Sequence, residues 1–196
     1  MSSISKAVVV LGDQLDLKNP ALQANPPENA HVIMVESAAE STVVWVHKVR
    51  IALFLSAMRH FAEALRKAGY TVRYSTLSDS ENRNLTDQVA HLCRQHGYSS
   101  IDMAEPGEWR LEQDMLAMAK RESIKLRMLE DSHYLCSRAE FAKWASSYKQ
   151  MRMEYFYREM RKRTNVLMDG KEPIGGKWNF DADNRSAFPK SGPGNI

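Results

Sequence analysis

Short apolar runs alternate with amphipathic segments along the first two thirds of the chain. Five runs rich in Val, Ile, Leu, Met and Tyr lie at residues 7–11, 31–35, 70–74, 100–104 and 124–129. Their length and composition are typical of strands in a parallel sheet that is covered on both faces. Between them, apolar residues recur at three- and four-residue spacing at 46–68, 85–95 and 109–122, which predicts amphipathic helices.

The longest predicted helix, 46–68, carries two apolar stripes. One stripe contains Val49 and Leu53, and the other contains Met58 and Leu65. Both have the three- and four-residue spacing of an amphipathic helix. Gly69 follows the helix and is expected to end it.

Five strands that alternate with helices predict a doubly wound, parallel α/β sheet of the flavodoxin-like or Rossmann-like type. Right-handed crossovers favour the strand order 3-2-1-4-5, numbered along the chain. We expect this α/β domain to span residues 5–135. Residues 136–196 are expected to form a helical and loop segment, with helices at 137–148 and 151–164 and mostly irregular structure from Gly170.

The composition is that of a globular domain without a membrane anchor. The chain has 196 residues, of which 43% are hydrophobic and 26% charged. We expect no signal peptide, because the N-terminus goes straight into a short apolar strand. We expect no transmembrane span, because no apolar run approaches the roughly 20 residues that a bilayer requires. Cys93 and Cys136 are too few for a disulfide framework, which favours a reducing, cytoplasmic location.

Positive charge is concentrated near the C-terminus. Residues 149–190 hold ten Lys/Arg against six Asp/Glu, while the rest of the chain is nearly neutral. This excess is typical of a surface for nucleic acid or another acidic partner. A solvated helix with internal ion pairs, such as Glu154 with Arg158, accounts for the same pattern.

The strand order also predicts where a ligand would bind. In such sheets the crevice opens beyond the carboxyl ends of the strands where the order reverses, here between the first and fourth strands. Residues 12–15 follow the first strand, 36–40 the second and 105–108 the fourth. Their carboxylates, amide and backbone N–H groups suit a flat ligand with a polyhydroxyl tail. Taken singly, Asp13 is also typical of a turn, and Glu105 of a helix N-terminus.

Other chemistries find no support in the sequence. Neither a G-x-G-x-x-G nor a G-x-x-x-x-G-K-[ST] motif is present, and the predicted crevice is acidic, so a phosphate cradle is disfavoured. The histidines and cysteines show no metal-ligand spacing, and no nucleophile-and-base motif occurs. We therefore expect neither a catalytic set nor a metal site within this chain.

Two C-terminal strings have unusual compositions. Residues 151–163 read MRMEYFYREMRKR, a basic helix with aromatic residues on one side. Residues 175–185 read GGKWNFDADNR and combine glycines, aromatics, carboxylates, amides and cations. Neither a helical nor a strand period fits the second string, which predicts an ordered loop whose side chains act individually.

These two strings resemble the interdomain region of the bacterial iron–sulfur photolyases and cryptochromes, also called prokaryotic (6-4) photolyases. The resemblance runs along nearly the whole chain. It also includes Leu11–Leu15, His47–Lys48, Phe54–Ala62 and Glu105–Arg110.

The resemblance implies an N-terminal antenna domain that binds 6,7-dimethyl-8-ribityllumazine and passes excitation to FAD. In the family, the FAD and an iron–sulfur cluster with four Cys ligands lie in a helical C-terminal domain. The activity implied is light-dependent repair of (6-4) pyrimidine photoproducts, or blue-light sensing. We expect that helical domain to be missing from this chain, which would then hold no catalytic residue.

Two sets of residues follow from the crevice and the resemblance together. The antenna pocket is predicted to be lined by Gly12, Asp13, Gln14, Leu15, Glu40, Phe54 and Glu105. A contact with DNA or with the missing FAD domain is predicted for Arg158, Arg161, Arg163, Lys177, Trp178, Asn179 and Arg185. The ring of Phe54 is expected to narrow the pocket and could leave it empty.

Partners follow from the same segment. We expect weak binding to DNA through its basic side chains. We also expect contact with the missing FAD domain or with a second copy of the chain through exposed aromatics. Two alternatives remain from the sequence: a stand-alone nucleotide- or flavin-binding α/β protein without photochemistry, and an interaction domain whose basic tail docks onto a partner.

Overall fold

The computed structural model describes residues 4–80, 83–180, 190 and 192. Contacts between Cα atoms divide the chain into two compact units, with the boundary between Ser137 and Arg138. The first unit is an α/β domain, and the second is a smaller helical segment with a short hairpin.

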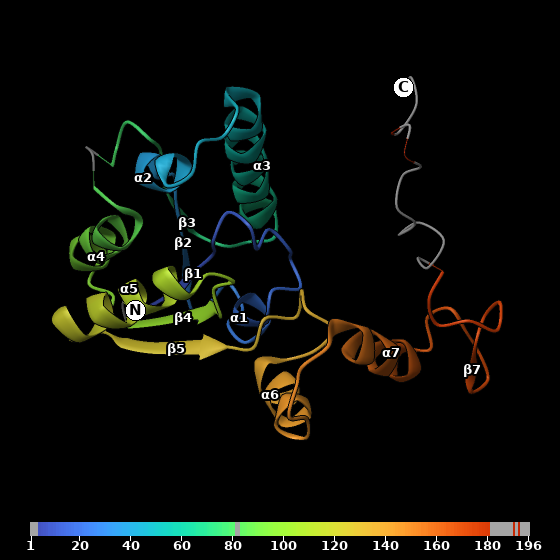
Figure 1. Cartoon of the computed structure of the whole chain (residues 1–196). Coiled ribbons are helices and arrows are strands. Elements are labelled where there is room, and N and C mark those ends of the chain that lie inside the picture. Colours follow the sequence, from blue (N-terminus) through green and yellow to red (C-terminus); the bar gives the residue numbers. More distant parts are fainter. Residues whose placement is uncertain (1–3, 81–82, 181–189, 191, 193–196) are drawn as a thin grey trace. The chain divides into compact units, whose positions relative to one another are not determined.

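Five parallel strands form the sheet of the first unit, in the order β3-β2-β1-β4-β5 (Figure 1). Their bounds are Lys6–Val9 for β1, His31–Val35 for β2, Val72–Ser75 for β3, Ser100–Ala104 for β4 and Lys125–Leu129 for β5. Every neighbouring pair is parallel. The predicted α/β fold and strand order are confirmed, and the order reverses between β1 and β4.

Helices cover both faces of this sheet. The bounds are Pro20–Gln23 for α1, Ala38–Thr42 for α2, Lys48–Lys67 for α3, Leu85–His96 for α4 and Trp109–Arg121 for α5. Buried residues of α1 and α3 pack on one face of the sheet, and those of α4 and α5 pack on the other. The sequence analysis did not anticipate α1 and α2, each of which has fewer than six residues.

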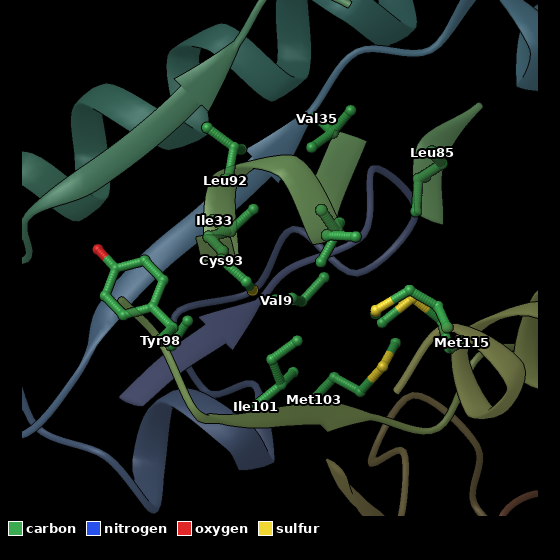
Figure 2. Close-up of a cluster of buried hydrophobic side chains, with 14 of the residues drawn as sticks. Val9, Ile33, Val35, Leu85, Leu92, Cys93, Tyr98, Ile101, Met103 and Met115 are labelled. Atoms are coloured by element: carbon green, nitrogen blue, oxygen red, sulfur yellow. The ribbon is translucent and has the colours of Figure 1, made fainter. Parts of the chain in front are cut away.

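Alternation along the strands separates two apolar cores. Val9 and Ile33, which are register partners, face α4 and α5, whereas Val8 and Val32 face α1 and α3. The α4 and α5 side is filled by Ile101, Met103, Met115 and other large side chains (Figure 2). Burying both faces explains why the strands read as nearly continuous apolar runs.

The structure settles which stripe of α3 is buried. Met58 and Leu65 are 2% and 0% exposed, whereas Val49 and Leu53 are 63% and 70% exposed. The helix therefore contacts the sheet through the stripe of Met58 and Leu65, and the second stripe is left on the surface.

The second unit has a different construction. It contains α6 (Arg138–Ser146), α7 (Met153–Thr164) and a hairpin of β6 (Met168–Asp169) with β7 (Glu172–Pro173). The hairpin lies where irregular structure was expected. It turns at Gly170, whose φ of 58° is the left-handed conformation that glycine adopts without strain. Among the described residues, no helix is long and apolar enough to cross a membrane.

Candidate functional site

A cavity of about 280 Å³ opens at the carboxyl edge of the sheet, around the position where the strand order reverses. It is lined by the end of β1, the β2–α2 segment, one face of α3, the first residue of α4, and the β4–α5 loop. The lining residues are Leu11, Gly12, Asp13, Val35, Ser37, Glu40, Ser41, Val46, Arg50, Ile51, Phe54, Leu55, Met58, Leu85, Gly107, Glu108 and Leu111. This volume lies near the lower limit of small-molecule sites, which span about 300–1,000 Å³.

One wall of the cavity is a single face of α3. Arg50, Phe54 and Met58 recur every four residues and therefore point the same way. Met58 is buried, Phe54 is 45% exposed and Arg50 is exposed, so the wall changes from apolar to charged toward the solvent. A ligand with an apolar ring and a polar tail would match this gradient.

Phe54 lies directly against the backbone at Gly12, in the segment that follows β1. A Cβ atom built on Gly12 would come within 2.5 Å of a Phe54 ring carbon and 2.8 Å of the Met58 sulfur. Gly12 therefore allows the aromatic ring to approach the chain closely at the base of the cavity. The ring takes up space in the cavity, in line with the predicted narrowing.

The carboxylates at the cavity are held mainly by one arginine. Arg110 donates to both oxygens of Glu40, at 2.6 and 3.3 Å, and to Glu108 at 2.9 Å. These hydrogen bonds, with Glu40 first, raise the pKa of the Arg110 guanidinium above its ordinary value. Because each carboxylate oxygen has two acceptor sites, Glu40 can still accept a hydrogen bond from a ligand hydroxyl.

Other predicted pocket residues lie behind the cavity rather than in its lining. Gln14 is 1% exposed and donates from Nε2 to the carbonyl oxygen of Glu105 at 2.8 Å. This bond ties the end of β1 to the end of β4. Leu15 packs against the core on the α1 and α3 side. Among the predicted residues, Gly12, Asp13, Glu40 and Phe54 line the cavity, while Gln14, Leu15 and Glu105 do not.

Glu36, which follows β2, does not line the cavity either. Its buried carboxylate accepts hydrogen bonds from Arg59 at 2.6 and 2.9 Å, from the Tyr74 hydroxyl at 2.7 Å and from the Leu77 N–H at 3.0 Å. Burial opposes ionisation of Glu36, but these hydrogen bonds outweigh it and hold its pKa below the ordinary value. Glu36 therefore fastens α3 and the end of β3 to β2.

Several lining residues were missed by the sequence analysis. Ser37 and Ser41 lie near Glu40 because α2 begins there, with Ser37 as its N-cap. Arg50 faces the cavity because it shares the α3 face of Phe54. The sequence analysis predicted Phe54 as a pocket residue, and the four-residue spacing from Phe54 was the signal that could have identified Arg50 as well.

In the second unit, cations gather around one indole ring. The guanidinium carbons of Arg158 and Arg161 and the Nζ atom of Lys162 lie 5.7, 5.3 and 5.4 Å from the centroid of Trp178. Arg161 is buried and donates to the carbonyl oxygens of Val166 and Leu167. Its guanidinium is thus committed within the unit, whereas Lys162 is exposed.

The remaining residues predicted to contact DNA or another domain differ in accessibility. Lys177 and Asn179 are exposed, and Arg163 is exposed while paired with Glu140 at 2.7 Å. Arg185 lies outside the described residues. Of the aromatics, Phe180 is 62% exposed. The contact expected with a second copy through such residues stays a prediction.

No group of three or more His, Cys, Asp or Glu side chains in the described part of the chain is arranged to hold a metal ion. Cys93 is buried, and burial, with a smaller contribution from Glu122, raises the pKa of its thiol to about 12. A neutral thiol is a poor metal ligand. Cys93 and Cys136, the two cysteines of the chain, do not fit the iron–sulfur cluster implied by the resemblance, which has four Cys ligands.

Comparison with known proteins shows the family of this chain. Residues 8–195 match the family described as deoxyribodipyrimidine photo-lyase-related protein. The chain belongs to this family. The match takes in both units, the β1 and β4 ends that line the cavity, and the cation-rich α7 segment.

The chain is similar to two relatives, and it covers a different share of each of them. A (6-4) photolyase of Agrobacterium fabrum is 43% identical over 183 residues, which are 93% of this chain but 36% of the photolyase. An uncharacterized protein, R852, of Acanthamoeba polyphaga mimivirus is 23% identical over 145 residues, or 72% of each chain. The chain described here, a member of the photolyase-related family, thus spans about a third of the length of the photolyase that it matches.

Proposed function

We propose that this chain is the antenna part of a photolyase-related flavoprotein and that its cavity binds a ribityl-substituted aromatic chromophore such as 6,7-dimethyl-8-ribityllumazine. The observation that carries the proposal is the cavity at the carboxyl edge, with an apolar base at Met58 and a polar rim at Asp13 and Glu40. Similarity to a (6-4) photolyase supports a photolyase-like role for the chain.

The two ends of the cavity would recognise different parts of the chromophore. A planar ring would lie toward Met58 and Leu111 and beside Phe54, because apolar and aromatic surfaces favour a flat ring. The ribityl hydroxyls would reach the rim, where Asp13 and Glu40 accept hydrogen bonds and Arg50 donates them. Light absorbed by this chromophore would be passed to a flavin.

Repair or sensing itself would need more than this chain. We propose that the FAD and the iron–sulfur cluster implied by the family resemblance bind in the part of the relatives that this chain does not span. The exposed cations of the second unit, Lys162, Arg163 and Lys177, would add weak, salt-sensitive attraction to DNA. The same chromophore would serve a repair enzyme or a blue-light sensor.

Titration with the lumazine, followed by its fluorescence, tests the antenna proposal. Chromophore binding should be weakened by about fivefold to 150-fold in an Asp13→Ala, Glu40→Ala double variant, because two hydrogen bonds of about 0.5–1.5 kcal/mol each are removed. Glu63→Ala is the matched control, since Glu63 is an ion-paired carboxylate of α3 outside the cavity lining. Equal binding by the double variant and the control would remove this cavity as the antenna site.

The mimivirus relative favours a second candidate function, because the match covers most of that protein's own length. In this alternative the chain is an α/β protein that binds a nucleotide or flavin without photochemistry. An absorption spectrum after incubation with the lumazine, FMN and FAD in turn separates the two functions. Retention of the lumazine supports the antenna, and retention of a flavin alone supports the alternative.

A further inference from the structure

A second cluster of polar side chains lies at the amino ends of the strands, at the opposite edge of the sheet from the cavity. His31 is the first residue of β2, Arg73 is the second of β3, His96 is the last of α4, and Tyr98 leads into β4. Arg73 is the register partner of Ile33, which packs on the α4 side of the sheet. His31 precedes Ile33 by two residues, so it faces the same side.

Tyr98 contacts each of the other three residues of the cluster. Its hydroxyl lies 2.6 Å from His31 Nδ1 and 3.5 Å from Arg73 Nε. The rings of His31 and His96 lie 5.6 and 5.7 Å from the Tyr98 ring. Figure 2 shows Tyr98 at the margin of the apolar core, with its hydroxyl pointing away from the aliphatic side chains.

Arg73 lacks the counter-charge that Arg59, Arg110 and Arg127 have. Arg59 and Arg127 each bind a carboxylate, but among the described residues Arg73 has no carboxylate within ion-pair distance. Its hydrogen bond to the neutral Tyr98 hydroxyl is long, and the residue is half-buried. The carbonyl end of α4 supplies only partial negative charge.

The histidines respond to this unbalanced charge. Burial lowers the pKa of His31, and Arg73 and His96 lower it further. Burial and then Arg73 lower the pKa of His96. No carboxylate acts against either effect. The neighbouring Arg94 of α4 is paired with Glu122, and the buried Cys93 thiol stays neutral.

We propose that this cluster binds a small phosphate anion through Arg73, His96 and the Tyr98 hydroxyl. The planar guanidinium of Arg73 can donate two parallel N–H bonds to such an anion. The bound anion would favour the protonated histidines, because an opposite charge stabilises the charged form. Once protonated, His31 donates from Nδ1 to Tyr98, and the phenol hydrogen turns to the anion.

Protonation of the histidines provides a direct test with the whole chain. The imidazole signals of His31 and His96 are followed by NMR as a function of pH, in sodium chloride and in inorganic phosphate at equal ionic strength. Both titration midpoints should rise by about one unit in phosphate, which corresponds to about tenfold tighter binding to the protonated form. Identical midpoints in the two salts would overturn the proposal without the need for any variant.

Variants and a second ligand sharpen the result. Arg73→Gln should abolish the phosphate effect, whereas the control Arg66→Gln should keep it, since Arg66 is already paired with Glu63. Adenosine monophosphate distinguishes the two sources of phosphate: a larger rise than with phosphate assigns the site to a nucleotide, and an equal rise assigns it to the free ion. A rise seen only with a DNA oligonucleotide would reject the small-anion site and assign the surface to nucleic acid.

Discussion

The α/β unit buries aliphatic side chains on both faces of its sheet, whereas the only buried residues described in the C-terminal unit are Arg161 and Pro173. In place of an aliphatic core, the second unit has contacts among Phe141, Trp144 and Phe156, with ring centroids 5.0–5.7 Å apart. It also has cations around Trp178.

This difference has consequences for function. Apolar burial contributes about 25 cal/mol per Å² and gives a rigid frame, which a ligand cavity requires. Cation–π contacts at exposed positions contribute only about 0.5–1 kcal/mol each, but they keep charged groups near the surface. The first unit therefore has a rigid frame around its cavity, and the second keeps cations and aromatic side chains near its surface.

The largest expected effect comes from the aliphatic core. Ile101→Ala should lower the free energy of unfolding of the first unit by about 4 kcal/mol, because Ile101 of β4 is fully buried in the core on the α4 and α5 side of the sheet. Denaturant unfolding followed by circular dichroism measures the loss. Ile174→Ala in the second unit, where the side chain is 53% exposed, should change stability by less than about 0.5 kcal/mol. Similar losses for both variants would contradict the comparison.

A smaller effect should follow from crowding the base of the cavity. Gly12→Ala should cost about 2–3 kcal/mol, because the new methyl group meets the Phe54 ring and the Met58 sulfur. Thermal unfolding of a double-mutant cycle tests the cause: in a Phe54→Ala background the cost of Gly12→Ala should fall. An unchanged cost would show that Phe54 is not the residue that limits space there.

Glu36 predicts a dependence on pH. Because its pKa in the folded state lies below that of an ordinary glutamate, the ionised form favours folding. This contribution is fully present above about pH 4.5 and is lost as the pH falls through the folded-state pKa.

Glu36→Gln should lower stability at pH 7 by about 1–2 kcal/mol, because the charge-assisted bonds from Arg59 are weakened. Unfolding measured from pH 7 to pH 3 should show a smaller acid-dependent loss in this variant than in the wild type. Glu63→Gln is the control, because Glu63 forms an exposed ion pair on α3, the helix that carries Arg59. A pH dependence unchanged by Glu36→Gln would assign the acid sensitivity to other groups, such as Asp102, whose pKa is also lowered: burial raises it, but hydrogen bonds from Arg127 and Asn25 outweigh this.

The smallest effect is expected in the second unit and should stay local. Arg161→Met should loosen the hairpin by about 1 kcal/mol, because two carbonyl oxygens lose a buried donor. Amide exchange near Met168 should become faster, and Trp178 fluorescence should change. Arg163→Met, which removes an exposed ion pair, should leave both nearly unchanged. A global loss of stability in the Arg161 variant would mean that the two units unfold together.

The sequence by itself determined the sheet. The runs that begin near Ala7, His31 and Ser100 are apolar throughout because strands covered on both faces have no side that faces water. Right-handed crossovers then allowed few strand orders, and the order in turn placed the crevice between β1 and β4. Gly12, Asp13 and Glu40 line the cavity there, since the topology brings their segments to one edge.

Only the tertiary structure decided the environment of residues that are of the same type and close together in the sequence. Glu36 and Glu40 lie four positions apart, yet Glu36 is buried against Arg59 and Glu40 meets Arg110 at the cavity. Arg161 is buried while Arg163 is exposed, although both belong to one basic run. Each outcome depends on partners distant in sequence or on which face of a helix is covered. A periodic pattern shows that a face exists, but only packing against other elements selects the face that is buried.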